Sequence, residues 1–209
     1  MALPGASEVW PRRRAVFALV GVAALGVPAA DGVAAVAEVA GVRFDRVLRT
    51  PELPGELQLN GFALHRLFGF QVYAIGLYLP EPRRSAESAI AMPGAKRIEM
   101  NVLREITAEQ LSSALAEGIT ENHPPAEVER FRPRMSMLDR VMQDIGKVGR
   151  GTRIAIDWLP VGVTRVVVDG RPRGEPIAGE DFYRALMRIW LGERPVSDNL
   201  KRGMLGRDS

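Results

Sequence analysis

The segment Leu59–Pro80, with the sequence LNGFALHRLFGFQVYAIGLYLP, constrains the fold of this chain more than any other. It contains two apolar runs, Asn60–Leu64 and Phe68–Leu79, separated by the polar pair His65-Arg66. Aromatic and β-branched residues dominate the second run, which is typical of a half-buried strand. The glycines of the segment argue against a helix and indicate tight turns or close backbone approach. We therefore predict a strand, a short turn and a longer strand that ends at the closing proline.

The pair His65-Arg66 has two interpretations at this point. A cationic pair between two apolar strands is suited to a binding site. The same pair is also suited to the solvated corner of a hairpin, where polar residues interrupt apolar runs.

Length and composition limit the classes of protein to consider. With 209 residues, 46% of them hydrophobic, the chain suits one globular domain with a sizeable core. The net charge is +3, and the first 37 residues contribute three arginines and two acidic residues to it, so the rest carries only +2. No basic block with interleaved aromatics follows the N-terminus, which argues against a nucleic-acid partner. The chain has no cysteine, which excludes disulfides and thiolate chemistry.

The N-terminal segment has the pattern of a signal peptide. Arg12-Arg13-Arg14 precede the apolar run Ala15–Ala30, and Ala35-Val36-Ala37 forms an A-x-A cleavage site before Glu38. We expect a signal peptide over residues 1–37, a mature domain over residues 38–209, and a periplasmic or secreted location. An uncleaved anchor is the alternative, although the run is short for a membrane span. The twin arginines also hint at twin-arginine export.

The rest of the chain alternates between strand and helix patterns. Further strands are predicted at Glu38–Leu48, Lys96–Arg104, Thr152–Leu159, Val163–Asp169 and near Gly174–Ile177. Helices are predicted at Ser85–Met92, from the capping box at Thr107 to before His123, and at about Ala126–Lys147, Asp181–Leu191 and Asp198–Leu205. This order indicates an α+β fold with helices packed on an antiparallel sheet.

Several kinds of chemistry lack a sequence signal here. The chain has no phosphate-binding loop, no dinucleotide-binding glycine motif, no zinc-protease motif and no nucleophile elbow. Its only histidines are His65 and His123, so we expect no metal site and no cofactor. His123 precedes two prolines and suits a helix end. Methionines at 135, 137 and 142 allow a ligand-pocket interpretation, but on an amphipathic stripe they are also ordinary core residues.

The segment Leu59–Pro80 resembles the signature strand pair of the chalcone isomerase-like family. Weaker likenesses follow in the family's order, at Leu103–Ile106, Gly179–Phe182, Ile189–Gly192 and Val196–Lys201. The resemblance implies an open-faced β-sandwich in which a long antiparallel sheet carries helices on one side, with a ligand cleft between them. Family members include chalcone-cyclising enzymes, non-catalytic relatives and fatty-acid-binding proteins.

Transferred residue by residue, the resemblance weakens the case for an enzyme. The family's cleft arginine corresponds to His65, with Arg66 one position further, and one step along a strand reverses the face unless a bulge intervenes. The catalytic threonine corresponds to Tyr73, the catalytic tyrosine to Leu111, and the pocket threonine to Ile189. Cyclisation needs polar groups at these positions, and most of them are apolar here.

Three hypotheses follow. The leading one is an exported, non-catalytic carrier or sensor of a fatty acid or similar hydrophobic carboxylate, bound by His65, Arg66, Tyr73, Leu111 and Ile189. The second is an isomerase or intramolecular lyase on a chalcone-like or enone substrate, with His65 as acid/base and Tyr73 as donor. The third is a pocketless structural protein in which Phe62, Phe68, Phe70 and Tyr73 form plain core. Membrane contact is expected only through an uncleaved signal peptide.

Overall fold

The computed structural model describes residues 36–207. The predicted signal segment therefore lies outside the described residues, apart from its last two positions. These belong to the first strand, β1 (Val36–Val39), in which Ala37 is buried. Cleavage after Ala37 would remove that half of β1.

A seven-stranded sheet, antiparallel throughout, is the centre of the described fold. Its strands in spatial order are β11 (Arg171–Ala178), β10 (Val163–Val168), β9 (Arg153–Leu159), β6 (Lys96–Val102), β5 (Phe70–Leu79), β4 (Leu57–Leu67) and β3 (Val47–Leu48). A short additional pair joins β7 (Ile106–Thr107) to β8 (Lys147–Val148).

The prediction of one opening strand over Glu38–Leu48 is wrong. The segment instead forms a hairpin, in which β1 pairs with β2 (Val42–Asp45), followed by the separate strand β3. The reason is the pair Ala40-Gly41, whose φ values of 52° and 78° are those of a two-residue hairpin turn.

The strand pair predicted within Leu59–Pro80 is confirmed as the β4–β5 hairpin, but its turn lies elsewhere. The pair His65-Arg66 lies within β4, so it is not the corner of the hairpin. The turn consists of Phe68 and Gly69, with φ values of 50° and 82°. A β-bulge between His65 and Arg66 interrupts the regular pairing of the two strands.

The helices follow the predicted segments closely. They are α1 (Ala86–Ala91), α2 (Ala108–Glu121), α3 (Pro125–Ile145), α4 (Glu180–Leu191) and α5 (Asp198–Met204). The capping box at Thr107 is formed, with the Thr107 hydroxyl accepting from the backbone N–H of Gln110 and the Gln110 side chain accepting from that of Thr107. His123 lies just after the end of α2, near the position expected, with its Nδ1 2.8 Å from the carbonyl oxygen of Ile119.

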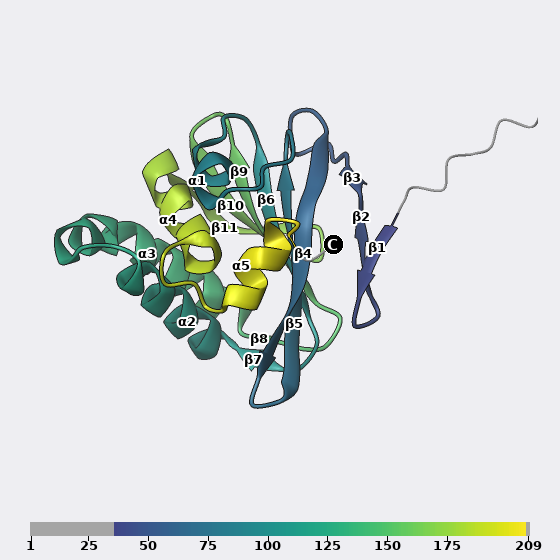
Figure 1. The fold of residues 1–209 in the computed structure, drawn as a ribbon. Helices are drawn as coiled ribbons and strands as arrows, with labels where there is room; N and C mark the ends of the chain where they lie inside the picture. The colour runs from purple at the N-terminus through teal and green to yellow at the C-terminus, as the bar shows by residue number, and fades with distance from the viewer. Residues whose placement is uncertain (1–35, 208–209) are drawn as a thin grey trace, which may run out of the picture. The chain divides into compact units, whose positions relative to one another are not determined.

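The two faces of the sheet are covered differently (Figure 1). The helices lie on one face, here called the helix-covered face, and enclose the main core, which includes Ile75, Leu77, Ile98 and Ile156 of the strands. The other face, here called the open face, is covered in part by the β1–β2 hairpin, which inserts Phe44 into a smaller cluster. This is the predicted α+β architecture of an open-faced β-sandwich.

Two glycines let α5 approach β4 at backbone distance. A Cβ added to Gly61 would collide with the carbonyl oxygen of Gly203, and a Cβ added to Gly203 would lie 2.6 Å from the carbonyl oxygen of Phe62. The neighbouring Asn60 donates its side-chain N–H to the carbonyl oxygen of Met204 at 2.7 Å. These contacts fix α5 across the outer part of the sheet.

Candidate functional site

His65 and Tyr73 lie opposite each other on β4 and β5, on the helix-covered face. They are register partners, and Tyr73 alternates with Ile75 and Leu77, which point into the main core. Of the pair His65-Arg66, it is therefore His65 that lies under the helices.

The two rings are packed together and held by a helix. Their centroids are 4.7 Å apart, with a tilt of 31° between the ring planes. From α4, the indole Nε1 of Trp190 donates a hydrogen bond to the Tyr73 hydroxyl oxygen at 3.2 Å. His65 Nδ1 is buried and finds no hydrogen-bond partner among the described residues. The Tyr73 hydroxyl accepts a bond here, and its own proton remains available to an acceptor.

Burial shifts the protonation equilibria of both groups toward their neutral forms. It lowers the pKa of His65 below its ordinary 6.5, so the imidazole is neutral at pH 7. Burial also raises the pKa of Tyr73 to about 12, against the smaller opposing effect of the Trp190 hydrogen bond. The pair therefore offers a neutral imidazole and a permanently protonated phenol in apolar surroundings.

Leu111 of α2 and Ile189 of α4 belong to the main core, against which Tyr73 is packed. They are 8% and 1% exposed. A Cβ added to Gly118 of α2 would lie 2.7 Å from a methyl carbon of Ile189, so the two helices are in close contact at this point. At the two positions that the resemblance assigns to the ligand cleft, the side chains are therefore packed in the core.

Arg66 is separated from this group. It is exposed, and it lines a cavity of about 420 Å³ with residues of β4 and of the α5 region, among them Ser197 and Asn199. Because of the bulge after His65, the register partner of Arg66 is Gln71. Of the five predicted ligand-binding residues, the structure thus brings His65 and Tyr73 into contact, buries Leu111 and Ile189 in the main core, and leaves Arg66 exposed.

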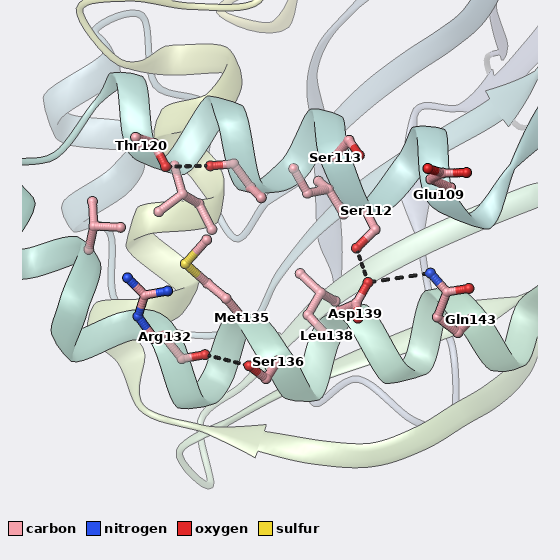
Figure 2. A pocket seen from close by; sticks show the side chains of 14 residues that line it. Glu109, Ser112, Ser113, Thr120, Arg132, Met135, Ser136, Leu138, Asp139 and Gln143 are labelled. Atoms are coloured by element: carbon pink, nitrogen blue, oxygen red, sulfur yellow. Dashed lines mark hydrogen bonds between the residues drawn. The ribbon is translucent and has the colours of Figure 1, made fainter.

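A groove of about 550 Å³ runs between α2 and α3 (Figure 2). Its walls combine apolar side chains, such as Leu115 and Met135, with a polar cluster in which Ser112 donates to Asp139. Met135 therefore lines a cavity, whereas Met142 is buried in the core. Neither His65 nor Tyr73 lines this groove or the other four cavities considered in the described part of the chain.

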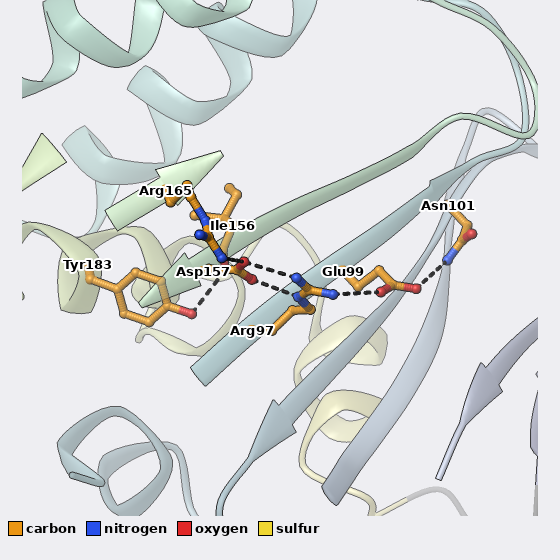
Figure 3. Close-up of polar contacts among 7 residues, drawn as sticks. All are labelled: Arg97, Glu99, Asn101, Ile156, Asp157, Arg165 and Tyr183. Carbon is orange, nitrogen blue, oxygen red and sulfur yellow. Dashed lines mark hydrogen bonds and ion pairs between the residues drawn. The ribbon is translucent and has the colours of Figure 1, made fainter. Parts of the chain in front are cut away.

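The open face carries a network of charged side chains (Figure 3). Arg97 donates two hydrogen bonds to the Asp157 carboxylate, at 2.6 and 2.9 Å, and Arg165 donates a third at 3.2 Å. Glu99 lies 3.8 Å from Arg97 and accepts from Asn101 at 3.4 Å. Because the acidic groups are engaged by arginines and an amide, this network is a structural element of the sheet.

Two features are absent from residues 36–207. No cluster of three or more histidine and acidic side chains is arranged to hold a metal ion in that range. Within the same range, no helix has both the length and the apolar character that a membrane span requires.

Sequence reasoning did not identify Trp190 as part of the site. Trp190 lies on the buried side of α4 and is 2% exposed. Its bond to Tyr73 joins residues 117 positions apart. One signal in the sequence pointed to Trp190: it directly follows Ile189, a predicted site residue, near the same end of a buried helix.

Comparisons with known proteins agree with this architecture. A crystal structure of a fatty-acid binding protein from Arabidopsis thaliana matches with a TM-score of 0.63 at 16% sequence identity, over 79% of this chain and 92% of that one. Comparison with curated proteins finds no match. The family model described as chalcone isomerase-like matches residues 35–206. The chain belongs to the chalcone isomerase-like family.

Proposed function

We propose that the protein is a non-catalytic carrier or sensor that binds a fatty acid or a similar hydrophobic carboxylate. The head group bonds to Tyr73 and His65, and the acyl chain lies between the sheet and helices α2 and α4. The similarity to a fatty-acid binding protein supports the class of ligand, and the chemistry of the two rings supports the place.

The observation that carries the proposal is the buried, unpaired nitrogen of His65, whose ring packs against that of a tyrosine with a proton to donate. Buried polar groups in folded proteins are almost always hydrogen-bonded, so an unpaired one needs a reason. A carboxylate accepts from the Tyr73 hydroxyl and from the imidazole when its Nδ1 is protonated. Its aliphatic chain matches the apolar surroundings.

Binding requires a change in the packing of the helices. Leu111 and Ile189 occupy the space under α2 and α4, so an acyl chain must displace them. Their displacement removes apolar contacts, and the acyl chain replaces these contacts with its own. The affinity depends on the difference in free energy between the contacts that are lost and the contacts that the acyl chain makes.

The test is native mass spectrometry with lipid extraction on protein purified from its own cell envelope. We expect a stoichiometric acyl ligand in the wild type and its loss in Tyr73→Phe. Tyr78→Phe is the matched control, because Tyr78 lies on the same strand but packs in the open-face cluster. A protein without ligand that also binds no added fatty acid would contradict the proposal.

An isomerase or intramolecular lyase receives less support from the geometry. A general acid works best when its pKa is near the working pH, and burial raises the pKa of Tyr73 to about 12. His65 and Tyr73 meet by ring packing. Turnover of an enone by the purified protein, abolished in His65→Gln, would reverse this preference.

Export to the periplasm is a further part of the proposal, supported by the charged, apolar and A-x-A sequence pattern of residues 1–37. It predicts a protein in the periplasmic fraction with a new N-terminus near Glu38. Mass spectrometry of the N-terminal peptide decides this. An intact first residue in the cytoplasmic fraction would contradict export.

A further inference from the structure

The tip of the β4–β5 hairpin (Arg66–Gln71), here called the hairpin tip, concentrates exposed apolar side chains. Phe68 is 90% exposed, Phe70 63% and Leu67 49%. The other large apolar side chains exposed in the described part of the chain are single valines at separate places. Isolated exposed residues are ordinary, whereas a contiguous apolar patch marks an interaction site.

The hairpin tip projects beyond the rest of the sheet. The neighbouring strand β6 pairs with β5 only from Tyr73 to Tyr78, and one further backbone hydrogen bond joins Leu103 to Val72, so Phe70 and Gln71 have no strand beside them on that edge. Figure 1 shows the hairpin extending past the ends of its neighbours. The exposed rings are therefore free to meet a surface that the rest of the fold does not reach.

Local folding does not explain a phenylalanine at the turn. Phe68 has a φ of 50°, a region that favours glycine, asparagine and aspartate and disfavours a bulky side chain. With 90% of its surface exposed, it gains almost no packing in return. A backbone outlier of this kind at an exposed tip indicates a function.

Positive charge surrounds the rings. Arg66 is exposed at the base of the tip, and the guanidinium of Arg104 lies 5.2 Å from the centre of the Phe70 ring. The nearby carboxylate of Glu105 is paired with Lys147 at 2.9 Å. Aromatic and leucine side chains bordered by arginines are the composition of segments that enter the interface of anionic membranes.

We propose that the hairpin tip is a membrane-docking site that inserts its rings into the head-group region of a bilayer containing anionic lipids. The inference goes beyond the carrier function and does not depend on it, because it rests on the exposure and charge of the tip. Where both hold, docking places the protein at the source of its hydrophobic ligand.

A second copy of the chain suits the hairpin tip less well than a membrane. Three side chains offer far less than the roughly 800 Å² per partner of a stable interface. A symmetric contact through the tip would also bring the arginines of both copies together, and like charges repel.

The experiment measures quenching of a tryptophan at the tip by lipids with brominated acyl chains. Full-length Phe68→Trp and Val161→Trp are mixed with vesicles of equimolar phosphatidylcholine and phosphatidylglycerol, with the wild type as the fluorescence background. Val161 is the matched control because it is 82% exposed in the β9–β10 turn, at the opposite end of the sheet. Each probe reports its own position, so membrane contact by other segments does not imitate the result.

We expect strong quenching for Phe68→Trp and little for Val161→Trp. Replacing Phe68 and Phe70 with serine lowers partitioning into these vesicles about tenfold or more. Arg66→Gln/Arg104→Gln lowers it only when phosphatidylglycerol is present. Equal quenching at both positions, no quenching, or a dimer in solution that the serine variants dissociate would overturn the proposal. Docking that persists in Tyr73→Phe separates this result from the fate of the carrier proposal.

Discussion

Two groups of polar side chains, one on each face of the sheet, are buried in opposite ways. On the open face, Arg97, Asp157 and Arg165 form connected ion pairs, and the Asp157 side chain is fully buried. On the helix-covered face, the pair His65 and Tyr73 belongs to no such network: His65 Nδ1 finds no hydrogen-bond partner in the described part of the chain, and the Tyr73 hydroxyl accepts a hydrogen bond from Trp190.

This difference indicates which of the two groups stabilises the fold and which is available to bind a ligand. A connected network holds its members in place, and removing one member leaves a buried charge without compensation. An isolated polar group adds no such mutual support and costs stability when unpaired. We therefore assign the open-face network to stability and the His65–Tyr73 pair to binding, and the following variants test this division.

The largest expected effect is on the open face. Asp157→Ala leaves Arg97 and Arg165 without their carboxylate and lowers the free energy of unfolding by about 3–5 kcal/mol. Chemical denaturation measures the loss, and Glu99→Gln, at a less deeply buried member of the same network, serves as the control with a smaller loss. Acyl binding by the folded fraction stays unchanged. A folded Asp157→Ala variant that no longer binds would show that the faces are not independent.

Ile189→Ala lowers the free energy of unfolding by about 2–5 kcal/mol, because it removes a buried side chain. Unlike Asp157→Ala, it should raise the affinity for an acyl ligand, since it opens the space that the chain must enter. Isothermal titration measures the affinity. Ile156→Ala, on the same face under α4 but away from Tyr73, is the control, and an equal gain there would refute a specific site.

His65→Leu separates the two roles within one residue. Replacing an unpaired buried polar side chain with an apolar one should leave stability unchanged or raise it by about 1–2 kcal/mol. The same change removes a head-group contact and weakens acyl binding about tenfold. Thermal unfolding and titration are measured on one preparation. A variant that loses stability and retains affinity would reverse the assignment.

The smallest effect is the pH dependence of His65. A bound carboxylate favours the imidazolium and raises the lowered pKa of His65, so affinity should increase a few-fold as pH falls from about 8 to about 6. Without ligand, the pKa of His65 is lower in the folded than in the unfolded chain, so the unfolded chain takes up the proton first. The free energy of unfolding therefore decreases as pH falls through about 6.5. His65→Gln should remove both dependences.

Much of the fold follows from local sequence patterns. The capping box at Thr107, the alternation in Lys96–Val102 and the apolar stripe of the long helix α3 all correspond to elements of the structure. The errors occurred where a turn was hidden. Ala40 and Phe68 both adopt positive φ, which their residue types disfavour, so the sequence carries only the following glycine as a signal.

The site was less accessible to prediction. The resemblance directed attention to His65, Tyr73, Leu111 and Ile189, and the structure pairs the first two across β4 and β5 and buries the other two in the main core. The resemblance did not indicate that α2 and α4 pack tightly against each other, because this packing depends on the contact between Gly118 and Ile189. The plain-core hypothesis is wrong for Phe68 and Phe70, which are exposed.

The contact between Asn60 and Met204 joins residues 144 positions apart. The ribosome must therefore release residue 204 before β4 receives the helix that covers it. Folds that depend on such distant pairings form slowly, and until then the apolar strands stay exposed to association with other chains. The surface of β4 that α5 covers is therefore among the last parts of the fold to be completed.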